Sequence, residues 1–216
     1  MVECIGGIAA LTQVSFPDLR LRVENLCCRR GGRLIFEGVN LSLANGEALA
    51  LTGRNGAGKS SLIAMLCGRL RPDGGSIAIE GADEAELIEL SHLVGHRDGL
   101  KTALTARENL AFAQDVLGHP ALSPEAALDA VGLAHAAALP VGYLSAGQRR
   151  RVALARLLVS QRPFWLLDEP MSALDAASQA MLTGLMRGHL GAGGAILAAT
   201  HGPLGLDQAR EVRIGS

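Results

Sequence analysis

The sequence lacks both an excess of one charge and an apolar run long enough to span a membrane. Twenty Lys and Arg residues against 21 Asp and Glu give a formal net charge of -1, so the chain has no general attraction to nucleic acid or anionic lipid. The run VALARLLV falls well short of the roughly 18 residues of a membrane helix and contains Arg156. We therefore expect a soluble or peripheral protein that has no nucleic-acid partner.

Cysteine is also scarce, and its spacing excludes the common cysteine-based sites. The sequence contains neither paired C-x-x-C motifs nor the C-x-x-C-H of covalent haem attachment. The four cysteines, Cys4, Cys27, Cys28 and Cys67, are interpreted as reduced thiols, and no direct haem ligand is evident. Residues 1–18 are mildly apolar, but no basic residue precedes the apolar part and Glu3 lies within it, which does not fit a secretory signal. We interpret them as an N-terminal extension.

The patterning of residues 19–216 predicts a single α/β domain. Alternating residues from Leu19 to Leu43, interrupted by RRGGR, predict antiparallel strands joined by a turn. Next come a strand in GEALALTG, a helix in KSSLIAMLCGRL and a strand in GGSIAIEG. The segment from Thr105 to Leu139 is mostly helical, with Ser123 as a cap, and indicates a helical subdomain inserted at about residues 100–160.

The C-terminal third predicts the central sheet. A helix starts near Ala146, and the apolar strands FWLLD and AILAAT are separated by the helical stretch ASQAMLTGLMRGHL. Continuous apolar strands that alternate with helices are typical of a parallel sheet covered on both faces.

The stretch GRNGAGKS fits the phosphate-binding pattern G-x-x-x-x-G-K-[ST] and lies between a predicted strand and a predicted helix. Backbone N–H groups of such a loop wrap phosphates, Lys59 reaches the β- and γ-phosphates, where it serves both binding and catalysis, and Ser60 ligates Mg²⁺. The predicted nucleotide-binding residues here are Gly53, Arg54, Asn55, Gly56, Ala57, Gly58, Lys59, Ser60 and Ser61. The alternative is a purely structural glycine-rich turn.

Two acids follow the apolar residues of FWLLDEP. Asp168 at the strand end suits a second Mg²⁺ ligand, and Glu169 just beyond it suits a general base that accepts a proton from water. The alternative is a pair of solvated acids with no catalytic role.

The stretch LSAGQRRRVALAR places Ser145 and Gly147 where a helix begins. A hydroxyl, backbone N–H groups and the helix dipole then point at one spot suited to an anion. The alternative is an ordinary helix cap. Because the phosphate loop already surrounds a nucleotide from one side, a second anion site makes most sense against the nucleotide of another copy.

Taken in order, the phosphate loop, LSAGQ, LLDEP, SALD and His201 resemble the ATP-binding subunits of ABC transporters. The resemblance implies a P-loop NTPase of the ABC type, with a RecA-like mixed sheet, an antiparallel β subdomain and an inserted helical subdomain. It also implies ATP and Mg²⁺ as cofactors and a head-to-tail homodimer, in which the segment from Ser145 to Gln148, including Gly147, contacts the ATP of the partner copy. In the same pattern Asp175 lies in the loop that couples the two sites, and His201 contacts the γ-phosphate.

Two residues depart from this family pattern. Arg30 stands where an aromatic residue usually stacks on adenine, a role that a planar guanidinium can take over. Arg97 stands where a glutamine is expected near Mg²⁺ and the attacking water. Because guanidinium has only donors, Arg97 is no metal ligand.

The pattern GHRDGLKTALTARENL, together with Ala146 in LSAGQ (Leu144–Gln148, the signature segment), is similar to the ATP-binding subunits of cytochrome c maturation systems, often called haem exporters. This resemblance implies polytopic membrane partners and a peripheral position on the cytoplasmic face of the cell inner membrane. Two alternatives stay open: an ABC subunit for another solute, and a soluble ABC ATPase without a transport role.

Overall fold

The computed structural model describes residues 16–82 and 85–215. Of the predicted N-terminal extension, residues 1–15, and with them Cys4, lie outside this part of the chain. The described end of the extension is held by Asn45, whose side-chain oxygen accepts from the Leu19 amide and whose nitrogen donates to the Pro17 carbonyl, both at 2.9 Å.

Three strands form an antiparallel sheet in the order β2-β1-β4. They are β1 (Arg20–Arg30), β2 (Arg33–Ala44) and β4 (Gly74–Glu80). Gly31 and Gly32 both have positive φ, as a tight two-residue hairpin turn requires, and the register pairs Arg30 with Arg33. The antiparallel strands and the turn expected from RRGGR are confirmed.

A second sheet has five strands in the order β5-β6-β7-β3-β8, and every neighbouring pair in it is parallel. They are β3 (Ala48–Thr52), β5 (Ser91–Val94), β6 (Phe164–Asp168), β7 (Ala195–Ala199) and β8 (Arg210–Arg213). The sequence predicted β3, β6 and β7, but it missed β5 and β8 because SHLV and REVR are short and partly polar. Parallel and antiparallel strands thus lie in separate sheets.

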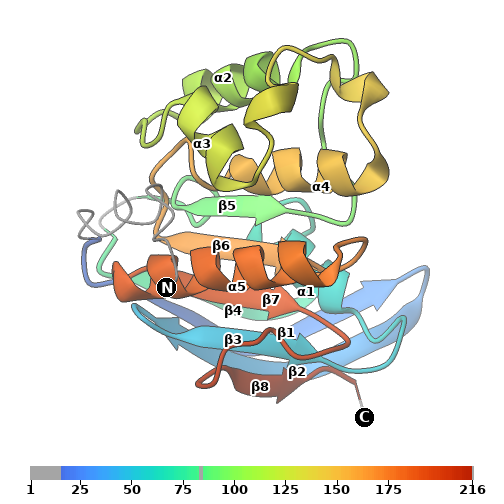
Figure 1. The fold of residues 1–216 in the computed structure, drawn as a ribbon. Helices are drawn as coiled ribbons and strands as arrows, with labels where there is room; N and C mark the ends of the chain where they lie inside the picture. The colour runs from blue at the N-terminus through green and yellow to red at the C-terminus, as the bar shows by residue number, and fades with distance from the viewer. Residues whose placement is uncertain (1–15, 83–84, 216) are drawn as a thin grey trace.

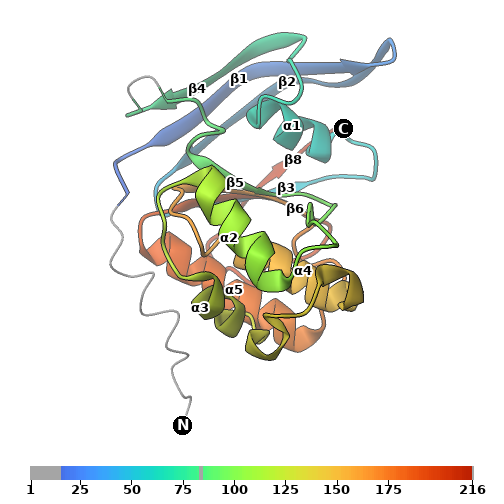
Figure 2. The same cartoon turned by 90° about the horizontal axis from the view of Figure 1, so that it is seen from above.

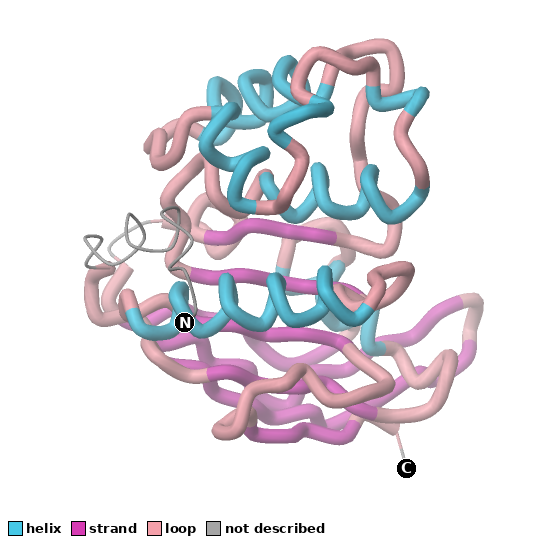
Figure 3. The backbone as a smooth tube through the Cα atoms, viewed as in Figure 1, coloured by secondary structure: helices cyan, strands magenta, loops and turns pink. Residues whose placement is uncertain are grey.

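The helices lie on both sides of the parallel sheet. Helix α1 (Lys59–Leu66) lies on the side of the antiparallel sheet, and α5 (Ala176–Gly191) covers the opposite face (Figures 1 and 2). The remaining helices form a layer beyond β5 (Figure 3): α2 (Ala106–Leu117), α3 (Pro124–Ala130), the short η2 (Ala134–Ala136) and η3 (Val141–Tyr143), and α4 (Ala146–Ala155). Ser123 caps α3 as predicted, because its hydroxyl accepts from the Ala126 amide. Within the described ranges, no helix combines the length and the apolar character that crossing a bilayer requires.

Alternate residues of the buried strands enter two hydrophobic cores. In β6, Trp165 and Leu167 pack into the core formed with the helical layer and α5. Phe164 and Leu166 point the other way, into the core that α1 shares with the antiparallel sheet. This alternation follows from the two-residue period of a strand, and it explains why the strand is apolar throughout. The two cores hold the carboxyl ends of β3, β6 and β7 side by side.

Candidate functional site

The loop between β3 and α1 takes a shape that its glycines permit. Gly53 has φ 141°, and a side-chain carbon added there would lie 2.3 Å from the Ile214 carbonyl oxygen. Gly58 is the left-handed N-cap of α1, and a carbon added there would lie within 2.7 Å of Ile35 and Phe36. Larger residues do not fit at either position. The phosphate loop, from Gly53 to Ser60, therefore packs against the β1–β2 hairpin and the C-terminal segment. At its glycines no side chain covers the backbone.

Lys59 opens helix α1 and is buried, with its ammonium inside the loop. The Lys59 Nζ donates to the carbonyls of Gly53 at 2.9 Å and Arg54 at 3.4 Å, and it lies 3.2 Å from His201 Nε2. The first turn of α1 holds no acidic residue. The exposed N–H groups of the helix start and the ammonium charge therefore both favour an anion.

Ser60, on the same helix, meets the end of β6. Its hydroxyl donates to Asp168 Oδ1 at 3.1 Å, although the two residues are 108 positions apart. A hydroxyl and a carboxylate are hard oxygen ligands of the kind that Mg²⁺ takes alongside phosphate oxygens. The structure brings together the two residues that the sequence predicted as magnesium ligands, and their role as ligands stays a prediction.

Glu169 follows Asp168 and turns toward the same edge. Its backbone has φ 49°, a conformation that non-glycine residues adopt mainly at functional or constrained positions. Glu169 Oε1 is buried without a hydrogen-bond partner among the described residues, and it lies 3.4 Å from His201 Nε2. The same imidazole nitrogen thus faces the donor-only ammonium of Lys59 and the acceptor Glu169, so its protonation decides which of the two it bonds.

The backbone around His201 is held in place by Thr200, a residue that the sequence analysis did not single out. The buried Thr200 hydroxyl donates to the Gly202 carbonyl at 2.8 Å and accepts from the Gly202 amide at 3.1 Å. These bonds close a tight turn around His201 at the end of β7. An ST-turn signal in THG was available in the sequence.

The signature segment forms the start of α4, in the helical layer. Ser145 is the N-cap: its oxygen accepts from the Gln148 amide at 3.2 Å, and Gln148 Oε1 accepts from the Ser145 amide at 2.9 Å. The cap leaves the hydroxyl proton of Ser145 available to an external acceptor. A side chain at Gly147 would meet only the Ala173 carbonyl oxygen, at an ordinary 3.6 Å. Packing inside this chain therefore does not demand glycine there.

The other predicted site residues lie further from this cluster. Asp175 is the N-cap of α5, and its carboxylate accepts from the Ser178 amide at 2.8 Å; the bonds from Ser178 lower the pKa of Asp175. Arg30 ends β1 and is exposed, at the hairpin whose second strand touches the phosphate loop. Arg97 is exposed in the loop after β5.

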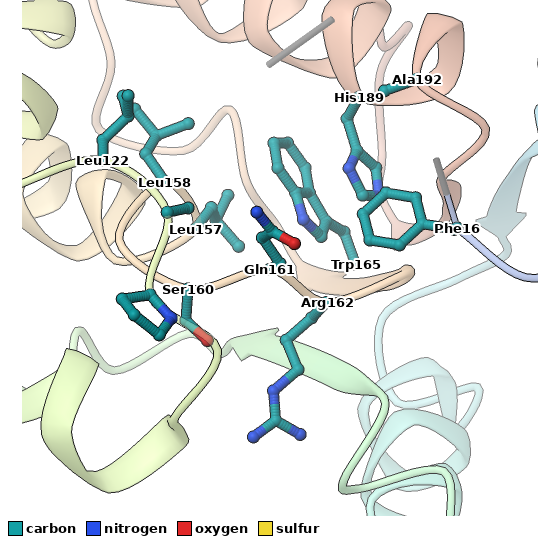
Figure 4. Close-up of a pocket in the computed structure, with 12 residues that line it drawn as sticks. Phe16, Leu122, Leu157, Leu158, Ser160, Gln161, Arg162, Trp165, His189 and Ala192 are labelled. Carbon is teal, nitrogen blue, oxygen red and sulfur yellow. The ribbon is translucent and has the colours of Figure 1, made fainter. Parts of the chain in front are cut away.

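A separate cavity of about 150 Å³ lies near the start of β6, away from Asp168 at the other end of that strand. His189 stacks on Trp165 with 4.0 Å between ring centroids, and Figure 4 shows the Arg162 guanidinium directed away from this pair. No group of three or more His, Cys, Asp or Glu in residues 16–82 and 85–215 is arranged to hold a metal ion. The cavity therefore plays no part in the cluster around Lys59.

Known proteins resemble this chain over most of its length. A family model described as ABC transporter matches residues 36–172. The cytochrome c biogenesis ATP-binding export protein CcmA of Rhodopseudomonas palustris is 54% identical over 199 residues, which cover 92% of this chain and 99% of the relative. Proteins of the same name from Nitrobacter winogradskyi and Agrobacterium fabrum are 55% and 52% identical; they cover 91% and 90% of this chain and 98% and 94% of the relatives.

Solved structures share the fold. A putative ABC transporter ATP-binding protein from Pyrococcus furiosus has a TM-score of 0.77 at 19% identity, over 90% of this chain and 97% of that one. A bacterial Atm1-family ABC exporter with ATP bound has a TM-score of 0.76 at 25% identity, over 94% of this chain and 37% of that one.

Proposed function

The chain belongs to the ABC transporter family, in the group of cytochrome c biogenesis ATP-binding export proteins, and from this premise we propose how its residues work. It is the ATP-hydrolysing subunit of an export system for cytochrome c biogenesis. The similarity extends over nearly the whole length of these relatives, which favours this function over a different solute or a role outside transport.

The residue roles rest on one observation: five side chains meet at the carboxyl edge of the parallel strands. They are Lys59, Ser60, Asp168, Glu169 and His201. In parallel α/β sheets this edge is where ligands bind. Although Lys59 and His201 are 142 positions apart in the chain, their side-chain nitrogens lie 3.2 Å apart.

We assign the roles as follows. The phosphates of ATP bind the bare N–H groups of the phosphate loop, and the Lys59 ammonium exchanges backbone carbonyls for phosphate oxygens. Ser60 and Asp168 would hold Mg²⁺, which would supply positive charge against the phosphates. Glu169 accepts a proton from the attacking water, since its buried Oε1 has no hydrogen-bond partner among the described residues. His201 contacts the γ-phosphate from beside Glu169.

A second copy completes each site. The Ser145 hydroxyl proton and the backbone at Gly147 are free to meet a phosphate from outside the chain. The start of α4, with no acidic residue in its first turn, favours an anion there. We propose a head-to-tail homodimer in which Ser145 to Gln148 closes over the ATP of the partner copy, with Asp175 in the loop between the two sites and Arg30 against the adenine.

We further propose that the dimer binds polytopic membrane subunits from the cytoplasmic face of the inner membrane. Helix α2 exposes two large apolar side chains, Phe112 at 50% and Val116 at 66%. Both line a groove with Leu100, in the loop that follows Arg97. The lining also includes Lys101 and Arg156, and Lys101 Nζ lies 5.0 Å from the centroid of the Phe112 ring. A groove that offers both apolar and basic groups suits a protein partner.

Glu169→Gln tests the assignment of the base. The amide keeps the size of the side chain but cannot take a proton, so ATP binding persists while turnover falls by roughly 10²-fold or more. Binding is measured by titration, turnover by phosphate release, dimer retention by size-exclusion chromatography with ATP, and cytochrome c content in cells that carry only the variant. The matched control is Glu125→Gln at an exposed position on α3; full turnover in Glu169→Gln would refute the assignment.

Lys59→Ala tests the phosphate loop separately. The variant loses the only ammonium inside the loop among the described residues, so direct titration is expected to show greatly weakened ATP binding. Unchanged affinity would remove the loop from the proposed mechanism.

A further inference from the structure

Three consecutive arginines on helix α4, Arg149, Arg150 and Arg151, contact three different parts of the protein. Arg149 donates to the Leu144 carbonyl within its own segment, and Arg151 donates to the Val131 carbonyl at 3.1 Å, beside α3. Only Arg150 turns into the protein, where it is 3% exposed. A buried guanidinium is expensive unless its donors and its charge are matched, so the groups around Arg150 show where it acts.

Arg150 bridges two segments that are distant in sequence. Its Nη1 donates to the Gly95 carbonyl at 2.8 Å and to Asp98 Oδ1 at 3.2 Å. Its Nη2 donates to the carbonyls of Glu169 at 2.9 Å and Asp168 at 3.3 Å. Its Nε is buried without a partner among the described residues. The guanidinium therefore makes four hydrogen bonds, to Gly95 and Asp98 in one segment and to Asp168 and Glu169 in the other, and leaves one donor unpaired within the described ranges.

We propose that Arg150 is a positioning residue for ATP hydrolysis, which fixes the backbone under Glu169 and ties it to the loop around Arg97. The inference rests on the proposed role of Glu169 as the base. Glu169 holds a positive φ of 49°, and such a backbone persists only where its surroundings restrain it. The Glu169 carbonyl accepts from the Ser172 hydroxyl at 2.8 Å within its own turn, and the bond from Arg150 adds a restraint from outside that turn. Asp98 supplies the counter-charge.

Two arginines, Arg150 on α4 and Arg156 at the C-cap of α4, hold the loop around Arg97. Arg150 binds Gly95 and Asp98, and Arg156 donates to the Asp98 carbonyl at 3.1 Å. The Arg97 side chain is exposed in the same loop. In this chain the link between that loop and the catalytic edge is thus made by Arg150 and does not need the side chain at position 97.

The link also joins the base to the signature segment. Arg150 is five residues from Ser145 on one continuous helix, a separation of about 7.5 Å along the axis. Because a short helix moves as a rigid body, a shift of its N-terminus against a partner nucleotide displaces the guanidinium and, with it, the Glu169 backbone. Position of the base and engagement of the signature segment are therefore coupled.

The test uses Arg150→Lys and Asp98→Asn in the full-length chain, in its complex with the membrane subunits. Lysine keeps the charge but cannot reach four acceptors in the planar arrangement, and misplacing a catalytic group by about 1 Å costs up to about 10²-fold in rate. We expect Arg150→Lys to lower kcat at least about tenfold, while the Kd for ATP changes less than about threefold. The double variant, which carries both Arg150→Lys and Asp98→Asn, is expected to have the same kcat as Arg150→Lys alone. Both substitutions disrupt the same contact between Arg150 and Asp98, so their effects do not add.

Arg151→Lys is the matched control on the same helix and is expected to change kcat and Kd less than about twofold. A structural loss differs in its readout, because it lowers Tm and raises the Kd together with the fall in kcat. An unchanged kcat in Arg150→Lys, a parallel loss of binding and stability, or additive effects in the double variant would each overturn the proposal. Asp98 is partly exposed, at 27% of its side chain, so Asp98→Asn keeps the test decisive should Arg150→Lys not fold.

Glu169→Gln, assayed in parallel, separates this inference from the proposed function. Full turnover in Glu169→Gln refutes the role of the base, whatever Arg150→Lys does. An inactive Glu169→Gln together with a normal Arg150→Lys refutes only the positioning role.

Discussion

Two buried histidines predict that stability falls on mild acidification. His92 is 4% exposed and its Nε2 lies 2.8 Å from the Ser160 carbonyl; His189 is also 4% exposed, stacks on Trp165 and lies 3.1 Å from the Pro163 carbonyl. A carbonyl can only accept, so each Nε2 carries a proton. Burial lowers the pKa of His92 to about 4 and that of His189 to about 3.

The sign and size follow from proton binding. In the unfolded chain both imidazoles have the ordinary pKa of 6.5. Below that pH the two imidazoles therefore bind more protons in the unfolded chain than in the folded chain. Their stabilising effect is therefore complete above pH 6.5 and is lost progressively as the pH falls toward the folded values. At pH 5 each histidine removes about 2 kcal/mol, and the pair removes about 4 kcal/mol. For a chain of this size, that lowers Tm by about 8–16 °C.

The assay is thermal unfolding from pH 8 to pH 5. This window avoids the carboxylates Glu108 and Asp175, whose lowered pKa values start from 4.5 and 3.8. His92→Gln is expected to halve the pH-dependent loss, because its amide reaches the same carbonyl and does not titrate. His135→Gln, at an exposed position, is the control that leaves the loss unchanged. A Tm that stays flat between pH 8 and pH 5, or that falls equally in His92→Gln, would refute the reasoning.

Three further predictions concern the site and the thiols. Gly53→Ala, which adds a carbon 2.3 Å from the Ile214 carbonyl oxygen, is expected to unfold more easily than Gly56→Ala, which meets nothing within 4 Å; equal Tm values would contradict the contact. Ser145→Ala removes the cap of α4 and is expected to cost about 1 kcal/mol in denaturant unfolding, and no loss would contradict the cap. Burial raises the pKa of Cys67 to about 11, so we expect a thiol reagent at pH 8 to modify it only after unfolding; fast native labelling would contradict that burial.

The sequence predicted those elements whose signal is local. The phosphate loop, the apolar strands around FWLLD and AILAAT, and the Ser123 cap each depend on residues within a few positions of one another. Strands β5 and β8 escaped because SHLV and REVR become strands only through their neighbours β6 and β3. A strand whose pairing comes from distant segments carries little signal of its own.

The parts of the site that the sequence did not reveal depend on the direction in which each side chain points. Arg149, Arg150 and Arg151 look alike in the sequence, and successive helical residues point about 100° apart, so only tertiary packing decides which one is buried. The role of Glu169 was predicted from its place after the strand FWLLD, and that of His201 from the family resemblance. That a single imidazole nitrogen faces both Lys59 and Glu169 depends on the three-dimensional geometry, which neither prediction contained. The sequence also gave no sign that Asp98 would serve as the counter-charge.

The resting position of Lys59 has a consequence for which adenine compounds the loop accepts. All three ammonium protons of Lys59 already have neighbours, two carbonyl oxygens and one imidazole nitrogen. A ligand must therefore compete with these neighbours for the ammonium protons. Only an anionic oxygen forms a stronger hydrogen bond to an ammonium than a neutral carbonyl does. Adenosine, which brings no such oxygen, gains nothing from Lys59, whereas a di- or triphosphate does. The phosphate loop thus selects against nucleosides before any contact with the base is made.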